Sequence, residues 1–289
     1  MSKTAIITDS NSGITQQQAE ELGIFVIAMP FSVEDKVYFE GITLSAEEFY
    51  KRLEEGANIN TSQPSPLDVT ELWETILNDY DEIVHIPMSS SLSATCETAM
   101  GLAQDYDGKI QIVDNQRISI TQRQSVLNAV TLVKQGKPAK EIKQILEAEK
   151  SESSIYLMVA TLKYLKKGGR ITPAAAAIGT VLNLKPVLQI QGGKLDAFAK
   201  VRGQNKAKAV MLDAMKKDLG TRFAEEHKKG NMALQIVYGG NHAEAEIWKQ
   251  EVMAAFPGME CHMDPVSLSV ACHVGPEILA VACAKRIED

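Results

Sequence analysis

The chain has 289 residues, of which 45% are hydrophobic and 23% are charged, and its formal net charge is −7. This length fits two packed domains, and the composition is that of an ordinary globular protein rather than a disordered or fibrous one. The acidic balance argues against non-specific binding to nucleic acid, which requires a strongly basic surface.

The first half of the chain alternates strand and helix signals. Buried strands are expected at 5–8, 24–29, 82–87 and 110–113, and helices at 15–23, 45–53, 66–80, 93–105, 121–135 and 139–150. Thr15 and Gln18 have the spacing of a capping box, and Pro66 suits the first turn of a helix. This rhythm predicts a parallel sheet covered by helices on both faces.

The pattern changes near residue 153, where we place the boundary between an N-terminal domain (1–153) and a C-terminal domain (154–289). Strands are expected at 155–160, 233–238 and 278–282, and helices at 206–217 and 243–255. Gly192 and Gly193 lie between apolar runs at 187–191 and 195–200, which is typical of a hairpin. The second domain is therefore predicted to be α/β with a mixed or antiparallel sheet.

The four cysteines are expected to be buried free thiols, because none forms a C-x-x-C pair and their neighbours are small or apolar. The apolar stretch at the N-terminus is too short for a signal peptide, and no segment approaches the roughly 20 apolar residues of a membrane span. We expect a cytoplasmic protein without stable membrane insertion.

The common catalytic motifs are missing. The sequence has no G-x-S-x-G, no phosphate loop, no G-x-G-x-x-G and no H-E-x-x-H, and its five histidines lack the spacing of metal ligands. This argues against the usual hydrolases, kinases, dehydrogenases and metalloenzymes, so we predict no catalytic residue and no metal site.

Three clusters rich in hydroxyl groups follow predicted strands: residues 8–12, 61–65 and 89–95. In open α/β sheets, ligands bind outside the carboxyl ends of the strands, and hydroxyl and backbone N–H groups there can hold an anion. Each cluster alone is equally typical of helix caps and turns. Three of them together favour a binding site.

These clusters, with Gly169-Arg170-Ile171, Arg202-Gly203 and His273-Val274-Gly275-Pro276, occur in the order and at the spacing of the DegV family, which the whole chain resembles. Two positions depart from the pattern: Ala94 and Glu277 stand where the family usually has glycine. We expect Glu277 to bring a carboxylate close to the site.

The resemblance implies a two-domain protein that holds a long-chain fatty acid between its domains and needs no other cofactor. It places the ligand's carboxylate against hydroxyls of the second and third clusters and the C-terminal histidine, which here are Thr61, Ser62, Ser93 and His273. Some family members are the acyl-binding subunit of a bacterial fatty acid kinase, in which a separate ATP-dependent subunit phosphorylates the carboxylate. The resemblance thus implies a non-catalytic carrier with a possible kinase partner.

The residue chemistry agrees with that implication. A buried carboxylate needs several hydrogen-bond donors, which three hydroxyls and an imidazole can supply. Asp9 would repel a carboxylate, so we expect it to hold neighbouring backbone N–H or hydroxyl groups instead. Arg170 and Arg202 are expected to face a phosphate or the partner, because a guanidinium binds such groups with two parallel bonds.

The acyl tail needs apolar walls, for which 174–178 with Val181 and Leu182, or Met158 with Leu162, are candidates. Each of these residues is equally typical of an ordinary core. Two rival functions stay open: an acyl-processing enzyme with Ser91 or Ser93 as nucleophile and His273 as base, and a phosphotransferase module related to dihydroxyacetone kinases.

Overall fold

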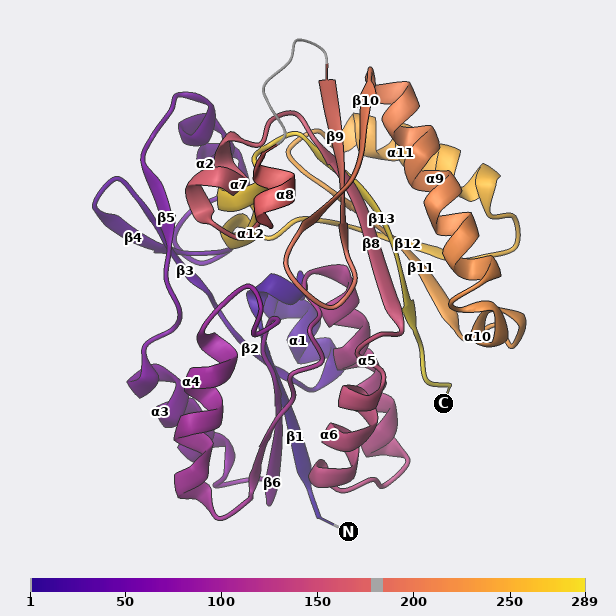
Figure 1. Cartoon of the computed structure of the whole chain (residues 1–289). Helices are drawn as coiled ribbons and strands as arrows, with labels where there is room; N and C mark the ends of the chain where they lie inside the picture. The colour runs from indigo at the N-terminus through magenta and orange to yellow at the C-terminus, as the bar shows by residue number, and fades with distance from the viewer. Residues whose placement is uncertain (1, 178–183, 289) are drawn as a thin grey trace.

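The computed structural model describes residues 2–177 and 184–288. Within them the chain forms two main sheets, each with helices packed against it, and a small third sheet at one side (Figure 1). The expected α/β class, with a parallel N-terminal sheet and a mixed C-terminal sheet, is confirmed.

Four parallel strands form the N-terminal sheet in the order β2-β1-β6-β7. Their bounds are Thr4–Asp9 (β1), Phe25–Ile27 (β2), Glu82–Ile86 (β6) and Ile110–Ile112 (β7). All residues of β1 are buried, as expected of a strand with helices on both faces.

Helices cover both faces of this sheet, as the sequence predicts. Those that pack on one face are α1 (Gln16–Leu22), α5 (Ile120–Lys134) and α6 (Ala139–Ala148). Those on the other face are α3 (Pro66–Ile76) and α4 (Thr95–Leu102). Two 3-10 turns, Ser10–Ser12 and Ala103–Tyr106, complete the set.

Residues close in the sequence stabilise the N-termini of α1 and α3. Thr15 accepts the backbone N–H of Gln18, and the Gln18 side chain accepts the backbone N–H of Thr15, which is the predicted capping box. Ser65 caps α3, and Pro66 occupies its first turn, where a missing N–H costs nothing.

A small lobe, which we define as residues 30–61, lies to the side of the N-terminal sheet (Figure 1). It consists of the antiparallel strands β4-β3-β5, with the helix α2 packed on them, and the sequence does not predict its sheet. The bounds are Pro30–Val33 (β3), Lys36–Phe39 (β4), Ala46–Glu54 (α2) and Ile59–Thr61 (β5). Phe31 and Phe49 meet edge to face at 5.4 Å in its core.

Six strands form the C-terminal sheet in the order β10-β9-β8-β13-β11-β12, and only β11 and β12 are parallel. The bounds are Ser153–Val159 (β8), Leu184–Ile190 (β9), Asp196–Arg202 (β10), Met232–Tyr238 (β11), Cys261–Pro265 (β12) and Ile278–Lys285 (β13). β9 and β10 form the hairpin predicted from Gly192 and Gly193.

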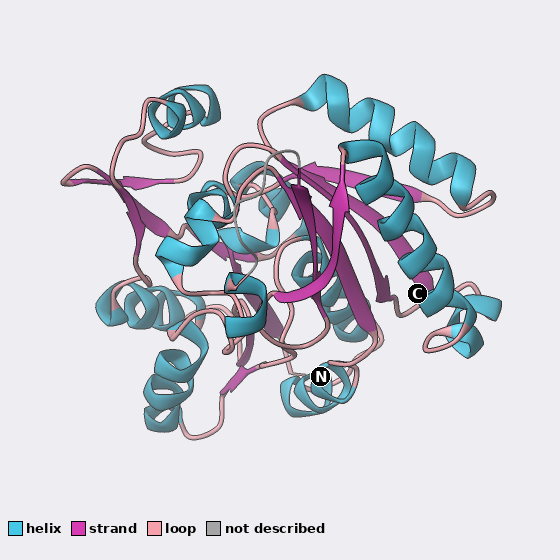
Figure 2. Ribbon diagram, turned by 45° about the horizontal axis from the view of Figure 1, so that its top comes forward, coloured by secondary structure: helices cyan, strands magenta, loops and turns pink. Residues whose placement is uncertain are grey.

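The long helices α9 (Gln204–Gly220) and α11 (His242–Ala255) cover the outer face of this sheet (Figures 1 and 2). The short helices on the inner face are α7 (Lys163–Gly168), α8 (Pro173–Ala176) and α12 (Leu268–Val274). Another short helix, α10 (Ala224–Lys228), follows α9.

The inner face of the C-terminal sheet packs against the N-terminal half of the chain. Helix α5 contacts strands of both main sheets, and one hydrophobic core joins the small lobe, the C-terminal sheet and α12. The expected domain boundary, between residues 153 and 154, falls at the start of β8 and stays a prediction.

Candidate functional site

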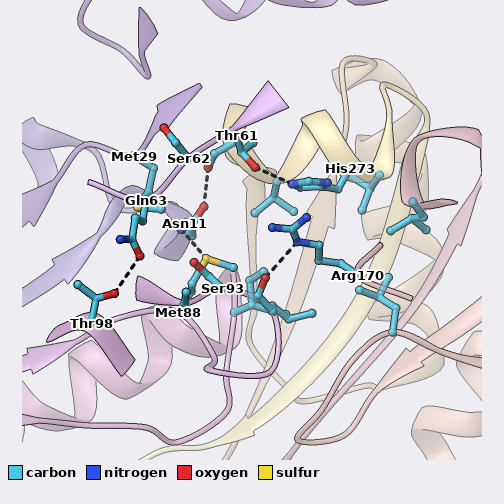
Figure 3. Close-up of a pocket in the computed structure, with 18 residues that line it drawn as sticks. Asn11, Met29, Thr61, Ser62, Gln63, Met88, Ser93, Thr98, Arg170 and His273 are labelled. Atoms are coloured by element: carbon cyan, nitrogen blue, oxygen red, sulfur yellow. Dashed lines mark hydrogen bonds between the residues drawn. The ribbon is translucent and has the colours of Figure 1, made fainter. Parts of the chain in front are cut away.

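A cavity of about 340 Å³ lies at this junction, a volume within the range of small-molecule sites (Figure 3). Half of its wall is apolar and comes from both halves of the chain: Met29, Met88, Leu92, Ala94, Ile118, Leu165, Leu195, Val270 and Val274. The polar part of the wall contains all four residues predicted to bind a carboxylate, together with Arg170.

Thr61 and His273 both line the cavity, and their side chains face each other (Figure 3). The Oγ1 of Thr61, at the end of β5, lies 3.0 Å from the Nε2 of His273, on the last turn of α12, although 212 residues separate them. Burial, with a smaller contribution from the Arg170 charge, lowers the pKa of His273 to about 4. The ring is therefore neutral near pH 7, and with its proton on Nε2 it donates to Thr61 and leaves the threonine O–H free for a ligand.

Gly168 gives the histidine ring its space. A Cβ at this position would lie 2.1 Å from the Nδ1 of His273, far inside contact distance. A side chain at position 168 would thus collide with His273, and this requirement for glycine becomes visible only in the folded chain.

Ser62 and Ser93 also line the cavity, and their contact with a carboxylate stays a prediction. The Oγ of Ser93 lies 2.8 Å from the Oγ1 of Thr95 and accepts the Thr95 backbone N–H at 3.2 Å, so it also supports the start of α4. Ala94 lies beside it in the wall.

Asn11 and Ser269 add a buried polar pair that the sequence does not predict. Ser269 donates from its hydroxyl to the Oδ1 of Asn11, whose amide nitrogen lies 2.9 Å from the Met88 sulfur. Asn11 is 1% exposed and Ser269 is 4% exposed, so this pair belongs to the deep part of the wall. The first hydroxyl cluster contains Asn11, but Ser269 has no local signal that distinguishes it from a turn residue.

Asp9 has the structural role expected for it. Its carboxylate accepts the backbone N–H of Asn11 at 3.0 Å and that of Met88 at 2.8 Å, and it also accepts from the Gln122 amide. Burial raises its pKa. It therefore holds two loops that form the cavity and does not line the cavity itself.

The two predicted arginines lie in different places. Arg170 lines the cavity, donates from Nε to the Leu92 carbonyl at 3.2 Å, and also donates to the Gly168 carbonyl (Figure 3). Arg202 is the exposed last residue of β10 and does not line the cavity, whereas Leu195, just before the start of that strand, does. The structure thus brings only one of the two arginines to the candidate head-group site.

The expected position of Glu277 and some of the residues expected to contact the acyl tail differ from what the structure shows. Glu277 does not line the cavity: the residue is exposed and lines a separate small hollow beside β8 and α11. Neither Met158 nor Leu162 lines the cavity, and Met158 packs on the outer face of the C-terminal sheet. Residues 178, 181 and 182 lie outside the described residues.

The geometry does not favour a serine nucleophile. Ser93 bonds to Thr95, and within residues 2–177 and 184–288 the hydroxyl that bonds to His273 is that of Thr61. No carboxylate among the described residues bonds to His273, and its lowered pKa makes it a weak base near neutral pH. Over the same residues, no group of three or more His, Cys, Asp and Glu side chains is placed to hold a metal ion.

The fold and the site together define a two-domain α/β protein with a ligand cavity between its halves. No helix within residues 2–177 and 184–288 has the length and hydropathy to cross a membrane. The family model "Uncharacterised protein, DegV family" matches residues 3–286. The chain belongs to the DegV family.

Known proteins support this membership. A "DegV domain-containing protein" from Deinococcus radiodurans is 32% identical over 259 residues, which is 89% of this chain and 90% of the relative. A Thermus thermophilus structure described as "Fatty Acid Binding of a DegV family Protein" is similar with a TM-score of 0.88 at 28% identity, over 98% of this chain and 99% of that one. The structure of "DegV, a fatty acid binding protein from Bacillus subtilis" has a TM-score of 0.86 at 26% identity, over 99% and 100% of the two chains.

Proposed function

We propose that this protein binds one long-chain fatty acid in the cavity, with the carboxylate beside Thr61 and His273, and carries it without catalysing a reaction on it. The observation that carries the proposal is the composition of the wall, which combines apolar side chains from both halves of the chain with hydroxyl and imidazole groups. A fatty acid likewise combines a long apolar tail with one anionic head.

The head-group site is assigned to Thr61, Ser62, Ser93 and His273. A carboxylate without partners is costly to bury, and hydrogen bonds from several donors offset that cost. The neutral imidazole orders the Thr61 hydroxyl, and the guanidinium of Arg170 supplies positive charge in the same wall. This arrangement supports an anionic ligand better than a neutral one.

The tail would lie against the methionine, leucine, isoleucine and valine side chains of the wall. Each buried methylene contributes about 0.8 kcal/mol, so a long chain can exceed the entropic cost of binding. The Thermus thermophilus and Bacillus subtilis relatives, both described as fatty acid binding, support this choice of ligand.

For the next step we propose presentation of the carboxylate to an ATP-dependent fatty acid kinase in the cytoplasm, which would form an acyl phosphate. In this proposal Arg170 acts at the cavity, and Arg202, exposed at the end of β10, acts in docking the partner. The family resemblance supports this step. A guanidinium also suits either a phosphate or an acidic partner surface.

The first experiment is native mass spectrometry of the purified protein, followed by organic extraction and identification of the released molecule. We expect a long-chain fatty acid near one equivalent per chain. A protein that is empty and also refuses added fatty acid would refute the carrier function. Turnover of ATP by the chain alone would favour the phosphotransferase alternative, and labelling of a serine by a fluorophosphonate would favour the enzyme.

A further inference from the structure

Glu40 connects the small lobe to α12. It follows β4, and its Oε1 accepts the backbone N–H of Leu268, the first residue of α12, at 2.7 Å. The two residues are 228 positions apart in the chain. A carboxylate from one half of the molecule thus holds the first turn of a helix in the other half.

The helix has no such support from its own sequence. Ser267 is at the N-cap position but makes no capping hydrogen bond from its side chain, and its hydroxyl lies 3.4 Å from that of Ser269. The first N–H groups of a helix lack partners within the helix, and an unpaired one is costly when buried. Glu40 therefore fulfils the task that a local serine performs in α3.

Helix α12 supplies four residues to the cavity wall: Ser269, Val270, His273 and Val274. His273 is one turn and a half from the residue that Glu40 holds, and its ring bonds to Thr61 in the small lobe. The small lobe therefore contacts α12 at both ends, through Glu40 at the start and Thr61 near the finish. The relative position of lobe and helix sets the Thr61–His273 distance.

The Oε2 of Glu40 is buried. Hydrogen bonds with the Leu268 backbone and the Ser10 side chain lower the pKa of Glu40, and no cation among the described residues contributes to that lowering. The titratable groups that face it are Asp9, Tyr50 and Cys272. Burial, with a smaller contribution from Asp9, raises the pKa of Glu40 to about 7, whereas the pKa values of Tyr50 and Cys272 are raised well above neutrality.

We propose that Glu40 is a positioning residue for the head-group site, which holds the start of α12 so that His273 meets Thr61. This inference rests on the proposed function. Loss of the acceptor is therefore expected to loosen the site.

The test compares the wild type with Glu40→Gln, which keeps a hydrogen-bond acceptor without a charge, and Glu40→Ala, which removes both. Glu47→Ala is the matched control, because Glu47 is an exposed glutamate of the same lobe. Palmitate affinity is measured by calorimetry at one fixed pH near neutrality. Circular dichroism shows whether all four proteins are folded under these conditions.

Glu40→Ala is expected to bind palmitate about tenfold more weakly, the scale of a lost helix cap, while Glu40→Gln stays within about twofold of the wild type. An Ala variant that binds like the wild type, or a Gln variant as weak as Ala, would overturn the positioning role.

A second readout works on the lipid-free protein and separates this inference from the proposed function. The NMR titration of the His273 ring reports whether it keeps its buried place against Thr61. In Glu40→Ala its pKa is expected to rise towards the ordinary value, and in Glu40→Gln it is expected to stay low. If palmitate does not bind even to the wild type, the proposed function fails, and an unchanged His273 titration in Glu40→Ala would overturn the positioning role independently.

Discussion

Gly168→Ala tests the head-group site with one methyl group. The new Cβ would lie 2.1 Å from the Nδ1 of His273, and ordinary contact begins near 3.4 Å, so the ring must move by about 1.3 Å. The backbone of Gly168 is helical and accepts alanine without strain. A shift of this size displaces the ring from its present position, 3.0 Å from Thr61, and disturbs the bond between them.

The expected cost to binding follows from the bonds lost. An ordinary hydrogen bond contributes about 0.5–1.5 kcal/mol, and one to a charged group contributes up to about 3 kcal/mol. Palmitate affinity should therefore fall about tenfold to a hundredfold in calorimetry, because each 1.4 kcal/mol is a factor of ten. Gly101→Ala is the control, since its Cβ would meet nothing within 4 Å on the helix α4.

A double-mutant cycle decides whether the ring is the cause. In a His273→Ala background the clash is absent, so Gly168→Ala should have no further effect on affinity. An unchanged affinity of the single Gly168→Ala variant would refute the head-group assignment of His273. An equal loss in both backgrounds would show that Gly168 acts through some other contact.

Three further predictions follow from the site. Thr61→Ala combined with Ser93→Ala should lower the amount of lipid that co-purifies, and an unchanged stoichiometry in native mass spectrometry would contradict their role as donors. Because burial lowers the His273 pKa from 6.5 to about 4, the unfolded chain binds the proton first. The free energy of unfolding is then lost as pH falls from about 6.5 to about 4. Denaturant melts at several pH values should show that this free energy depends less on pH in His273→Gln than in the wild type. Asp9→Ala leaves two buried backbone N–H groups without their acceptor and should cost at least about 2 kcal/mol of unfolding free energy, whereas a cost near zero would contradict the role given to Asp9.

Features with a local cause could be predicted from the sequence. The Thr15–Gln18 capping box, the first-turn Pro66 and the Gly192-Gly193 hairpin each depend on residues within a few positions of one another. The alternation of strands and helices also sufficed for the two main sheets.

The small lobe could not be predicted in this way. Its strands are three or four residues long, and the turn between β3 and β4 has Glu34 at a φ of +53°, where glycine or asparagine is the usual signal. No pattern in the sequence distinguishes such short runs from loop. Because this sheet was not predicted, the position of Thr61 at the end of β5 could not be predicted either.

The head-group residues proposed from the sequence lie in one cavity wall, and their role in binding stays a prediction. The bond between Thr61 and His273 joins residues 212 positions apart, and no local rule predicts it. The same holds for Glu40 and Leu268. Such pairs depend on how the two halves of the chain pack.

The distribution of the cavity wall along the chain also sets an order of events during synthesis. Roughly 180 residues separate Ser93 from His273, so at typical elongation rates of about 5–20 residues per second the histidine follows the serine by roughly 10 to 40 s. During that interval the apolar residues of the small lobe lack the residues of β8, β13 and α12 against which they pack in the folded protein. The newborn chain is thus expected to need protection from aggregation until its last strand leaves the ribosome.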